Sequence, residues 1–184
     1  MSEWIQTYTG NRFPFFNCRP EDLHIKDIAR ALSHICRFTG HVKTFYSVAQ
    51  HSVLVSEQTK NPFLGLMHDA PEAYVGDMSR PLKHSLGKDS RYHHADHCIV
   101  KAIEGRWKQL AEIKLDEIQD LKNVDMRMLV TEAYDLLEGG PLAEWKITQQ
   151  THPRYDFKIV PWHPEEAMQR FLLRYQQLSG EWPY

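Results

Sequence analysis

The feature that most constrains this chain is a long apolar period between residues 116 and 137. Hydrophobic side chains recur there every three or four residues, at Ile118, Leu121, Val124, Met128, Leu129, Ala133, Leu136 and Leu137. This spacing places one apolar stripe along a helix of about six turns, and such a stripe must be buried against other elements. Gly139-Gly140-Pro141 follows and ends the helix. The pattern favours a fold in which helices pack on helices.

Helical spacing also predicts helices over residues 24–38, 44–58, 91–107 and 164–179, and one from Pro62 to the pair His68-Asp69. Proline suits the first position of a helix, and a glycine suits the residue beyond its end, as Gly40 and Gly180 do here. Residues 142–163 follow no period and are expected to form an irregular loop or a short hairpin. We therefore expect a single all-α domain, a helical bundle over residues 1–184.

The first 23 residues are rich in aromatic residues, proline, asparagine and glycine. This composition favours an extended or looping arm over a helix. Because so many aromatic side chains are unlikely to stay in water, the arm is expected to pack on the domain or on a neighbouring subunit. The second possibility indicates a homo-oligomer.

The overall composition excludes several classes of protein. The formal net charge of −2 gives no basic patch for duplex nucleic acid, so an anionic ligand must be held by a few local cations. The three cysteines include no Cys-x-x-Cys pair, and no apolar run is long enough for a membrane span. We expect a reduced, cytoplasmic protein without a signal peptide or a membrane segment.

Ionisable residues gather in the segment Met67–Lys83, which holds His68-Asp69, then Glu72, then Asp77 and Lys83. Imidazole and carboxylate groups together are typical ligands of a borderline divalent cation. His51 and Asp125 fall on or beside the apolar stripes of two other predicted helices. Taken alone, His51 would more often be a core histidine, and Asp125 could pair with a neighbouring Lys or Arg. Together the four residues would satisfy one ion and leave positions for water and substrate.

The order His51, His68-Asp69, Asp125 resembles the HD-domain phosphohydrolase superfamily, whose fold is an all-α bundle around a divalent metal. The run His68-Asp69-Ala70-x-Glu72-x-x-x-Gly76-Asp77-x-x-x-Pro81-x-Lys83 is similar to its deoxynucleotidase branch. The segments Cys36-Arg37-Phe38 and Phe45–Ser52 also resemble that branch. The likeness covers roughly residues 25–138, and the compact chain looks close to small phage and bacterial dATP triphosphohydrolases of the DatZ type.

The resemblance implies a role for each residue of the site. His51, His68, Asp69 and Asp125 would hold the metal, and Glu72 would act as general acid or base. Asp77 would reach the sugar 3′-hydroxyl or a second metal. Arg37 and Lys83 would bind the phosphates, and Phe38 would pack on the sugar or base. The branch often carries a tryptophan at the position of Phe38.

The implied activity is hydrolysis of a small-molecule deoxynucleotide, with dATP as the favoured substrate, in a bacterial cytoplasm or a phage-infected host. The alternatives are a 5′-deoxynucleotidase that acts on monophosphates and a catalytically silent metal or nucleotide sensor. The ligands suit Zn, Co, Mn or Fe, and a second, carboxylate-rich site would suit Mg. A triphosphate needs further cations, for which the candidates are Arg80, Lys43, His41 and Arg12.

Overall fold

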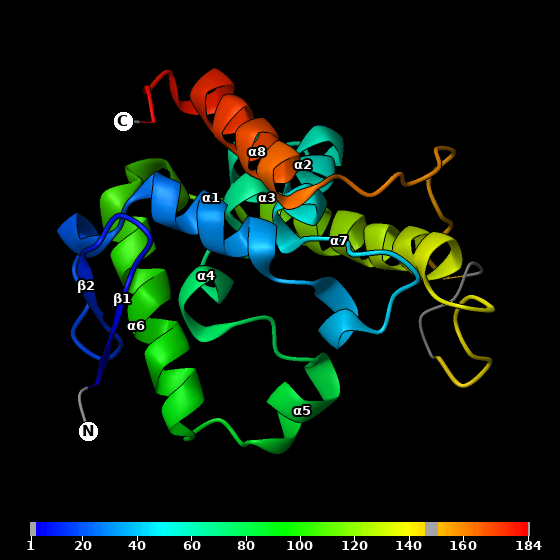
Figure 1. The fold of residues 1–184 in the computed structure, drawn as a ribbon, viewed down its shortest axis with the longest axis horizontal. Helices are drawn as coiled ribbons and strands as arrows, with labels where there is room; N and C mark the ends of the chain where they lie inside the picture. The colour runs from blue at the N-terminus through cyan, green and yellow to red at the C-terminus, as the bar shows by residue number, and fades with distance from the viewer. Residues whose placement is uncertain (1–2, 146–150, 184) are drawn as a thin grey trace.

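A computed structural model of the protein describes residues 3–145 and 151–183, and α-helices dominate these residues (Figure 1). The helices are α1 (Ile25–His34), α2 (Val48–Gln58), α3 (Pro62–Met67), α4 (Glu72–Val75), α5 (Arg80–Ser85), α6 (Arg91–Arg106), α7 (Leu115–Leu136) and α8 (Pro164–Ser179). Short 3-10 turns lie at Pro20–Asp22, Arg37–Gly40 and Lys108–Leu110. The prediction of an all-α fold is confirmed.

Two helices are shorter than predicted, because the segments beside them pair with each other. Helix α1 ends at His34 and not at residue 38, and α2 begins at Val48 and not at residue 44. The Arg37 amide donates to the Tyr46 carbonyl at 2.9 Å, and the Val48 amide donates to the Ile35 carbonyl at 3.1 Å. These bonds pair residues 35–37 with residues 46–48, at the two ends of the connection between α1 and α2. The Ser47 hydroxyl then accepts from the Gln50 amide at 3.1 Å and caps α2.

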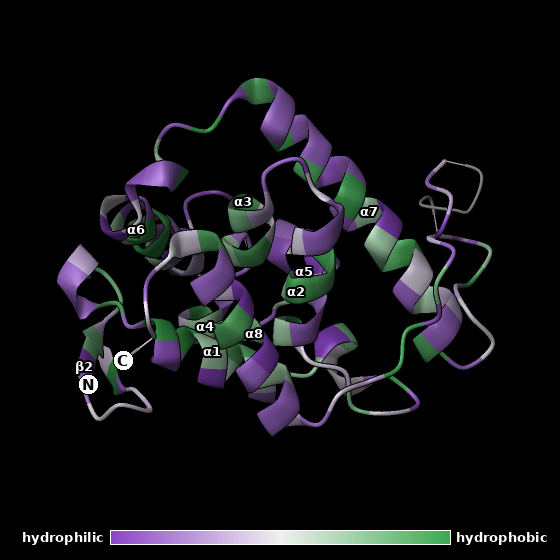
Figure 2. Cartoon of the chain, turned by 90° about the horizontal axis from the view of Figure 1, so that it is seen from above, coloured by the Kyte–Doolittle hydropathy of each residue, from purple (hydrophilic) through white to green (hydrophobic). Residues whose placement is uncertain are grey.

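Helix α2 lies at the centre of the bundle, against α1, α3, α7 and α8. It contributes Val48, Ala49 and Val53 to the main apolar cluster and Val55 to a smaller one that faces α7. Figure 2 shows the hydrophobic and hydrophilic residues alternating along α7. Burial on α7 is concentrated in its second half, since Leu115 is 85% exposed whereas Met128 is fully buried. Among the described helices, none is both long and apolar enough to cross a membrane.

The N-terminal arm contains a hairpin of two short strands, β1 (Trp4–Gln6) and β2 (Arg12–Pro14), paired antiparallel with Ile5 opposite Phe13. At its turn, the Thr9 amide and hydroxyl donate to the buried Asp27 carboxylate on α1 at 2.7 and 2.8 Å. Phe13 is fully buried and stacks on Tyr74 of α4 with the ring centroids 3.8 Å apart. The arm therefore packs on its own chain.

The segment between α7 and α8 has no helix or strand in its described residues, 142–145 and 151–163, while residues 146–150 of the predicted loop lie outside the described residues. Its second part is tied to the bundle by hydrogen bonds. The Ile159 amide donates to Asp135 at 2.7 Å, and the Trp162 amide donates to Gln50 at 2.8 Å. Irregular backbone is thus fixed by side chains of α7 and α2.

We expect Phe13→Ala to lower the free energy of unfolding by about 3–5 kcal/mol, because it removes a fully buried ring stacked on Tyr74. Urea denaturation measures this loss. The control is Tyr8→Ala in the same hairpin, whose ring is 60% exposed and which should cost less than about 1 kcal/mol. Equal losses for the two variants would show that the arm does not pack as described.

Candidate metal centre

Three helices bring the candidate ligands together. His51 lies at the end of the first turn of α2, His68 and Asp69 directly follow α3, and Asp125 lies near the middle of α7. Helix α3 begins with Pro62 after Asn61, whose side chain accepts from the Leu64 amide at 3.1 Å. A Cβ on Gly65 would lie 2.9 Å from the Ser56 Cα, so only glycine lets α3 approach α2 this closely. That approach brings His68 next to His51.

The ligand atoms converge on one point. The Nε2 atom of His51 lies 3.3 Å from Nε2 of His68, 3.5 Å from Asp69 Oδ2 and 3.4 Å from Asp125 Oδ1. His68 Nε2 lies 3.2 Å from Asp69 Oδ2. His51, His68 and Asp69 each offer one ligand atom within 4.8 Å of the others, so this group could hold a metal ion. Asp125 joins the group through its contact with His51.

The other nitrogen of each ring orients its histidine as a ligand. His68 Nδ1 donates to the Gly65 carbonyl at 2.8 Å, and His51 Nδ1 donates to the Glu132 carboxylate at 2.6 Å. A proton on Nδ1 leaves the Nε2 lone pair of the neutral ring available for a cation. Two Nε2 atoms and the nearby carboxylate oxygens form a donor set that fits a borderline divalent ion.

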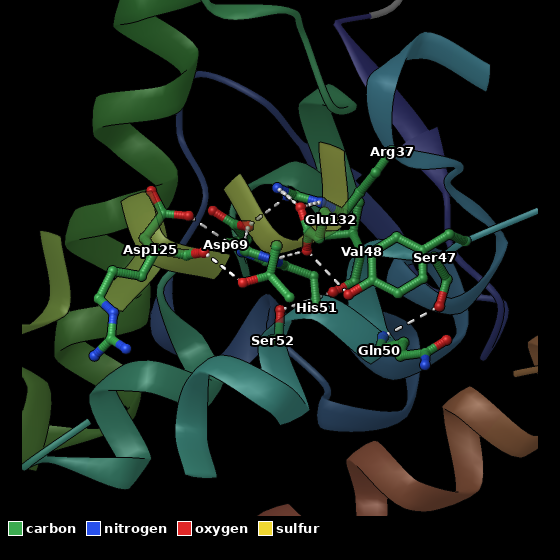
Figure 3. A network of polar contacts seen from close by, with 12 residues as sticks. Arg37, Ser47, Val48, Gln50, His51, Ser52, Asp69, Asp125 and Glu132 are labelled. Atoms are coloured by element: carbon green, nitrogen blue, oxygen red, sulfur yellow. Dashed lines mark hydrogen bonds and ion pairs between the residues drawn. The ribbon is translucent and has the colours of Figure 1, made fainter. Parts of the chain in front are cut away.

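Glu132 belongs to this site although the sequence reasoning missed it. It is fully buried, and it accepts hydrogen bonds from His51, from the Tyr46 hydroxyl at 2.9 Å and from Arg37 Nη2 at 2.8 Å (Figure 3). Burial raises the pKa of Glu132, but Arg37 and His51 outweigh it and hold the pKa below its ordinary value. One signal was available: Glu132 follows Asp125 by seven residues, or two helical turns, so the two carboxylates share a face of α7.

Arg37 lies in the site, but its guanidinium is already engaged. Besides Glu132, its Nη1 atom lies 3.7 Å from Asp69 Oδ2, and its side chain is only 12% exposed. Burial lowers the pKa of Arg37, yet the Glu132 and Asp69 carboxylates raise it above its ordinary value. Arg37 therefore contributes a fixed positive charge beside the ligands. Arg37 donates to Glu132 through Nε and Nη2. To bind a phosphate as expected, it would have to use its remaining N–H groups or give up these bonds to Glu132.

Glu72 occupies an unusual environment for a carboxyl group. Burial, together with the charges of Asp69 and Asp77, raises its pKa to about 9. Among the described residues, its Oε2 atom is buried without a hydrogen-bond partner. Asp77 follows Gly76, whose φ is 81°, and burial and Asp69 also raise the pKa of Asp77. Glu72 is thus protonated at neutral pH unless a cation binds nearby.

The two remaining predicted residues lie at the edge of the site. Phe38 has a φ of 55°, a left-handed conformation that is rare for an aromatic residue, and the Arg37 guanidinium lies 5.8 Å from its ring centroid. Lys83 on α5 lies 3.8 Å from Asp96 and 5.3 Å from the ring centroid of Tyr92, both on α6. The structure therefore places Phe38 beside the ligand group through Arg37, whereas the described contacts of Lys83 are with α6 and not with a candidate ligand.

No protein-family model matches the chain. It is 35% identical over 179 residues, or 96% of each chain, to YfdR of Escherichia coli K12, which is described as uncharacterized. The chain belongs to the YfdR family. The uncharacterized protein RCAP_rcc00048 of Rhodobacter capsulatus is 36% identical over 115 residues, 56% of this chain and 58% of that relative. These descriptions state no activity, so a function for this YfdR-family chain must be argued from its site.

We expect metal affinity to rise with pH. Burial lowers the pKa of His68, but Asp69 outweighs it and raises that pKa to about 9, so an ion must displace a proton below this pH. For one displaced proton, the affinity should increase by about tenfold per pH unit between about pH 6 and pH 8. Calorimetric titration with zinc or cobalt in buffers of different ionisation enthalpy measures both the affinity and the released proton.

The control for this titration is His163→Gln, since the His163 side chain is 77% exposed and pairs with Glu165 away from the candidate ligands. This variant should retain the full pH dependence. An affinity that stays constant across the range would mean that His68 is not a ligand.

We expect Glu132→Gln to weaken metal binding by about 10–100-fold, because the amide keeps the shape but loses the charge that orients His51. It should also lower the free energy of unfolding by about 3–5 kcal/mol, because Arg37 loses its main buried partner. Metal titration and urea denaturation measure the two effects. Glu138→Gln, at an exposed position, is the matched control. A folded Glu132→Gln protein with unchanged metal affinity would contradict the positioning role.

Proposed function

We propose that the protein is a metal-dependent phosphohydrolase acting on deoxynucleotides. One observation carries the proposal. Two imidazole nitrogens and two carboxylates converge beside Glu72, a buried carboxyl group whose Oε2 has no partner among the described residues. A hydrolytic centre needs a place for a cation and an adjacent group that can exchange a proton with the substrate or with water.

The residues present would hold a divalent ion through His51, His68, Asp69 and Asp125. When bound, such an ion polarises the scissile phosphate and lowers the pKa of a water ligand. The mixed nitrogen and oxygen donors suit Zn, Co, Mn or Fe. Asp77 lies close enough to Asp69 for their charges to interact, and this carboxylate-rich side would suit Mg as a second ion.

In the proposed reaction Glu72 exchanges the proton. With its pKa raised to about 9 by burial and by Asp69 and Asp77, it is protonated at neutral pH and can protonate the leaving oxygen. A cation beside it would lower this pKa and favour the base form, so the same residue can serve either direction of proton transfer. Arg37, fixed by Glu132, supplies positive charge near Asp69, where a phosphate would lie.

The choice of deoxynucleotide is supported by the likeness of the Gly76–Lys83 segment to the deoxynucleotidase branch, and dATP is the favoured substrate. Phe38 and Asp77 are the residues proposed to contact the sugar. The commitment of Arg37 to Glu132 favours the alternative of a 5′-deoxynucleotidase, since a monophosphate needs fewer cations. A catalytically silent sensor would need the same ligands but not Glu72.

The deciding experiment is a panel of nucleoside mono-, di- and triphosphates incubated with metal-loaded protein, with the products separated by chromatography. We expect dATP to yield deoxyadenosine and tripolyphosphate. Release of phosphate from monophosphates alone would establish the alternative activity. No hydrolysis with Zn²⁺, Co²⁺, Mn²⁺, Fe²⁺ or Mg²⁺ would contradict an enzymatic function and favour the sensor.

Glu72→Gln tests the proton-transfer role within the same panel. It should lower kcat by about 10²–10⁴-fold while metal binding persists. The control is Glu57→Gln, at an exposed position on α2, which should leave kcat unchanged. Full activity of the Glu72→Gln protein would remove Glu72 from the mechanism.

A further inference from the structure

Helix α5 stands apart from the rest of the bundle. Figure 1 shows it at the lower edge of the molecule, level with the lower end of α6 and joined to α4 and α6 by loops. Every residue from 79 to 89 is exposed except Lys83, which is half-buried. Gly76 and Gly87, with φ angles of 81° and 74°, lie in the connections on either side. An exposed short helix of this kind has no packing role that would explain its position.

The contacts of α5 are made by two cations on one face of the helix. Arg80 Nη2 lies 3.6 Å from Asp125 Oδ2, and Arg80 Nη1 lies 3.2 Å from the Met126 sulfur, both on α7. Lys83 Nζ lies 3.8 Å from Asp96 on α6. Residues three apart share a helix face. Arg80 therefore ties α5 to α7 beside the candidate ligand Asp125, and Lys83 ties it to α6.

Asp125, the partner of Arg80, is a candidate metal ligand. The contact between Arg80 and Asp125 therefore depends on whether a metal ion is bound. When Asp125 coordinates a cation, its charge is neutralised and the bound ion repels the nearby guanidinium. Arg80 is 54% exposed and its ion pair is long, so the free energy lost when it leaves Asp125 is small. Metal binding would thus release the Arg80 guanidinium from Asp125, next to the place where a substrate phosphate would lie.

Arg37, the other cation of the site, is not free to bind the outer part of a phosphate chain. Arg37 is almost fully enclosed and is bonded to Glu132 through both Nε and Nη2. A phosphate chain that extends outward from the metal would meet the α5 cations and not Arg37. The Tyr92 ring of α6 lies beside one of these cations, with its centroid 5.3 Å from Lys83 Nζ.

We propose that α5 selects substrates by the number of their phosphates, with Arg80, assisted by Lys83, binding the outer phosphates of a nucleoside polyphosphate. This inference rests on the proposed function, and it assigns to that site a polyphosphate chain in preference to a monophosphate. Arg80 is the specificity-determining residue, and its guanidinium exchanges the Asp125 carboxylate for phosphate oxygens when the metal is bound.

The test compares the binding of dAMP and dATP by isothermal titration calorimetry. The parent is the metal-loaded Glu72→Gln protein, which binds without turnover, and Mn²⁺ is kept in excess so that the triphosphate does not strip the site. Arg80→Gln should reduce the ratio of the dAMP to the dATP dissociation constant by about tenfold, and Lys83→Gln should reduce it in the same direction. Arg80→Lys, which keeps the charge, should restore part of the ratio.

The matched control is Arg170→Gln, since Arg170 is 53% exposed, forms a surface ion pair with Glu166 and lies on α8 at the opposite side of the molecule (Figure 1). It should leave the ratio unchanged. If the parent binds both nucleotides and Arg80→Gln does not alter the ratio, the role of α5 is wrong while the proposed function stands. If the parent binds neither nucleotide, both proposals are wrong.

Discussion

The interaction on which the rest of the site depends is the buried ion pair between Glu132 and Arg37. An ionised carboxylate with no solvent exposure is stable only when its oxygens are compensated, and here Arg37, Tyr46 and His51 compensate them. The pair joins α7 to the segment between α1 and α2 and fixes the ring of His51. It also explains why Arg37, although adjacent to the ligands, is not a free phosphate-binding cation.

The position of α2 determines where this network can form. Its residues contribute to both apolar clusters, so the helix is packed on several sides and His51 has little freedom to move. Gly65 then allows α3 to approach, and the end of α3 delivers His68 and Asp69 to the same point. A metal ion would therefore find these side chains already positioned, which favours binding because little ordering is left to occur.

Two carboxyl groups three residues apart, Asp69 and Glu72, have pKa values shifted in opposite directions. Burial raises the pKa of Asp69, but His68, His51 and Arg37 hold it well below its ordinary value. Glu72 is buried as well, yet it faces Asp69 and Asp77, and its pKa rises to about 9. The difference arises from the sign of the neighbouring charges, and it separates a carboxylate that could bind a cation from a carboxyl group that keeps its proton. The cations of helix α5, Arg80 and Lys83, are more exposed than Arg37 and pair over longer distances with Asp125 and Asp96.

The sequence by itself determined the local elements. Pro164 and Gly180 bound α8, the end of α3 falls at His68-Asp69, and the period over residues 116–137 corresponds to α7. These features depend on neighbours within a few residues, so periodicity and capping predict them. The end of α1, the hairpin that buries Phe13 and the partners of Arg37 were decided only by the tertiary structure. Glu132 lies 95 residues from Arg37 and 81 from His51 in the chain, and no local pattern determines which carboxylate such groups meet once the helices have packed.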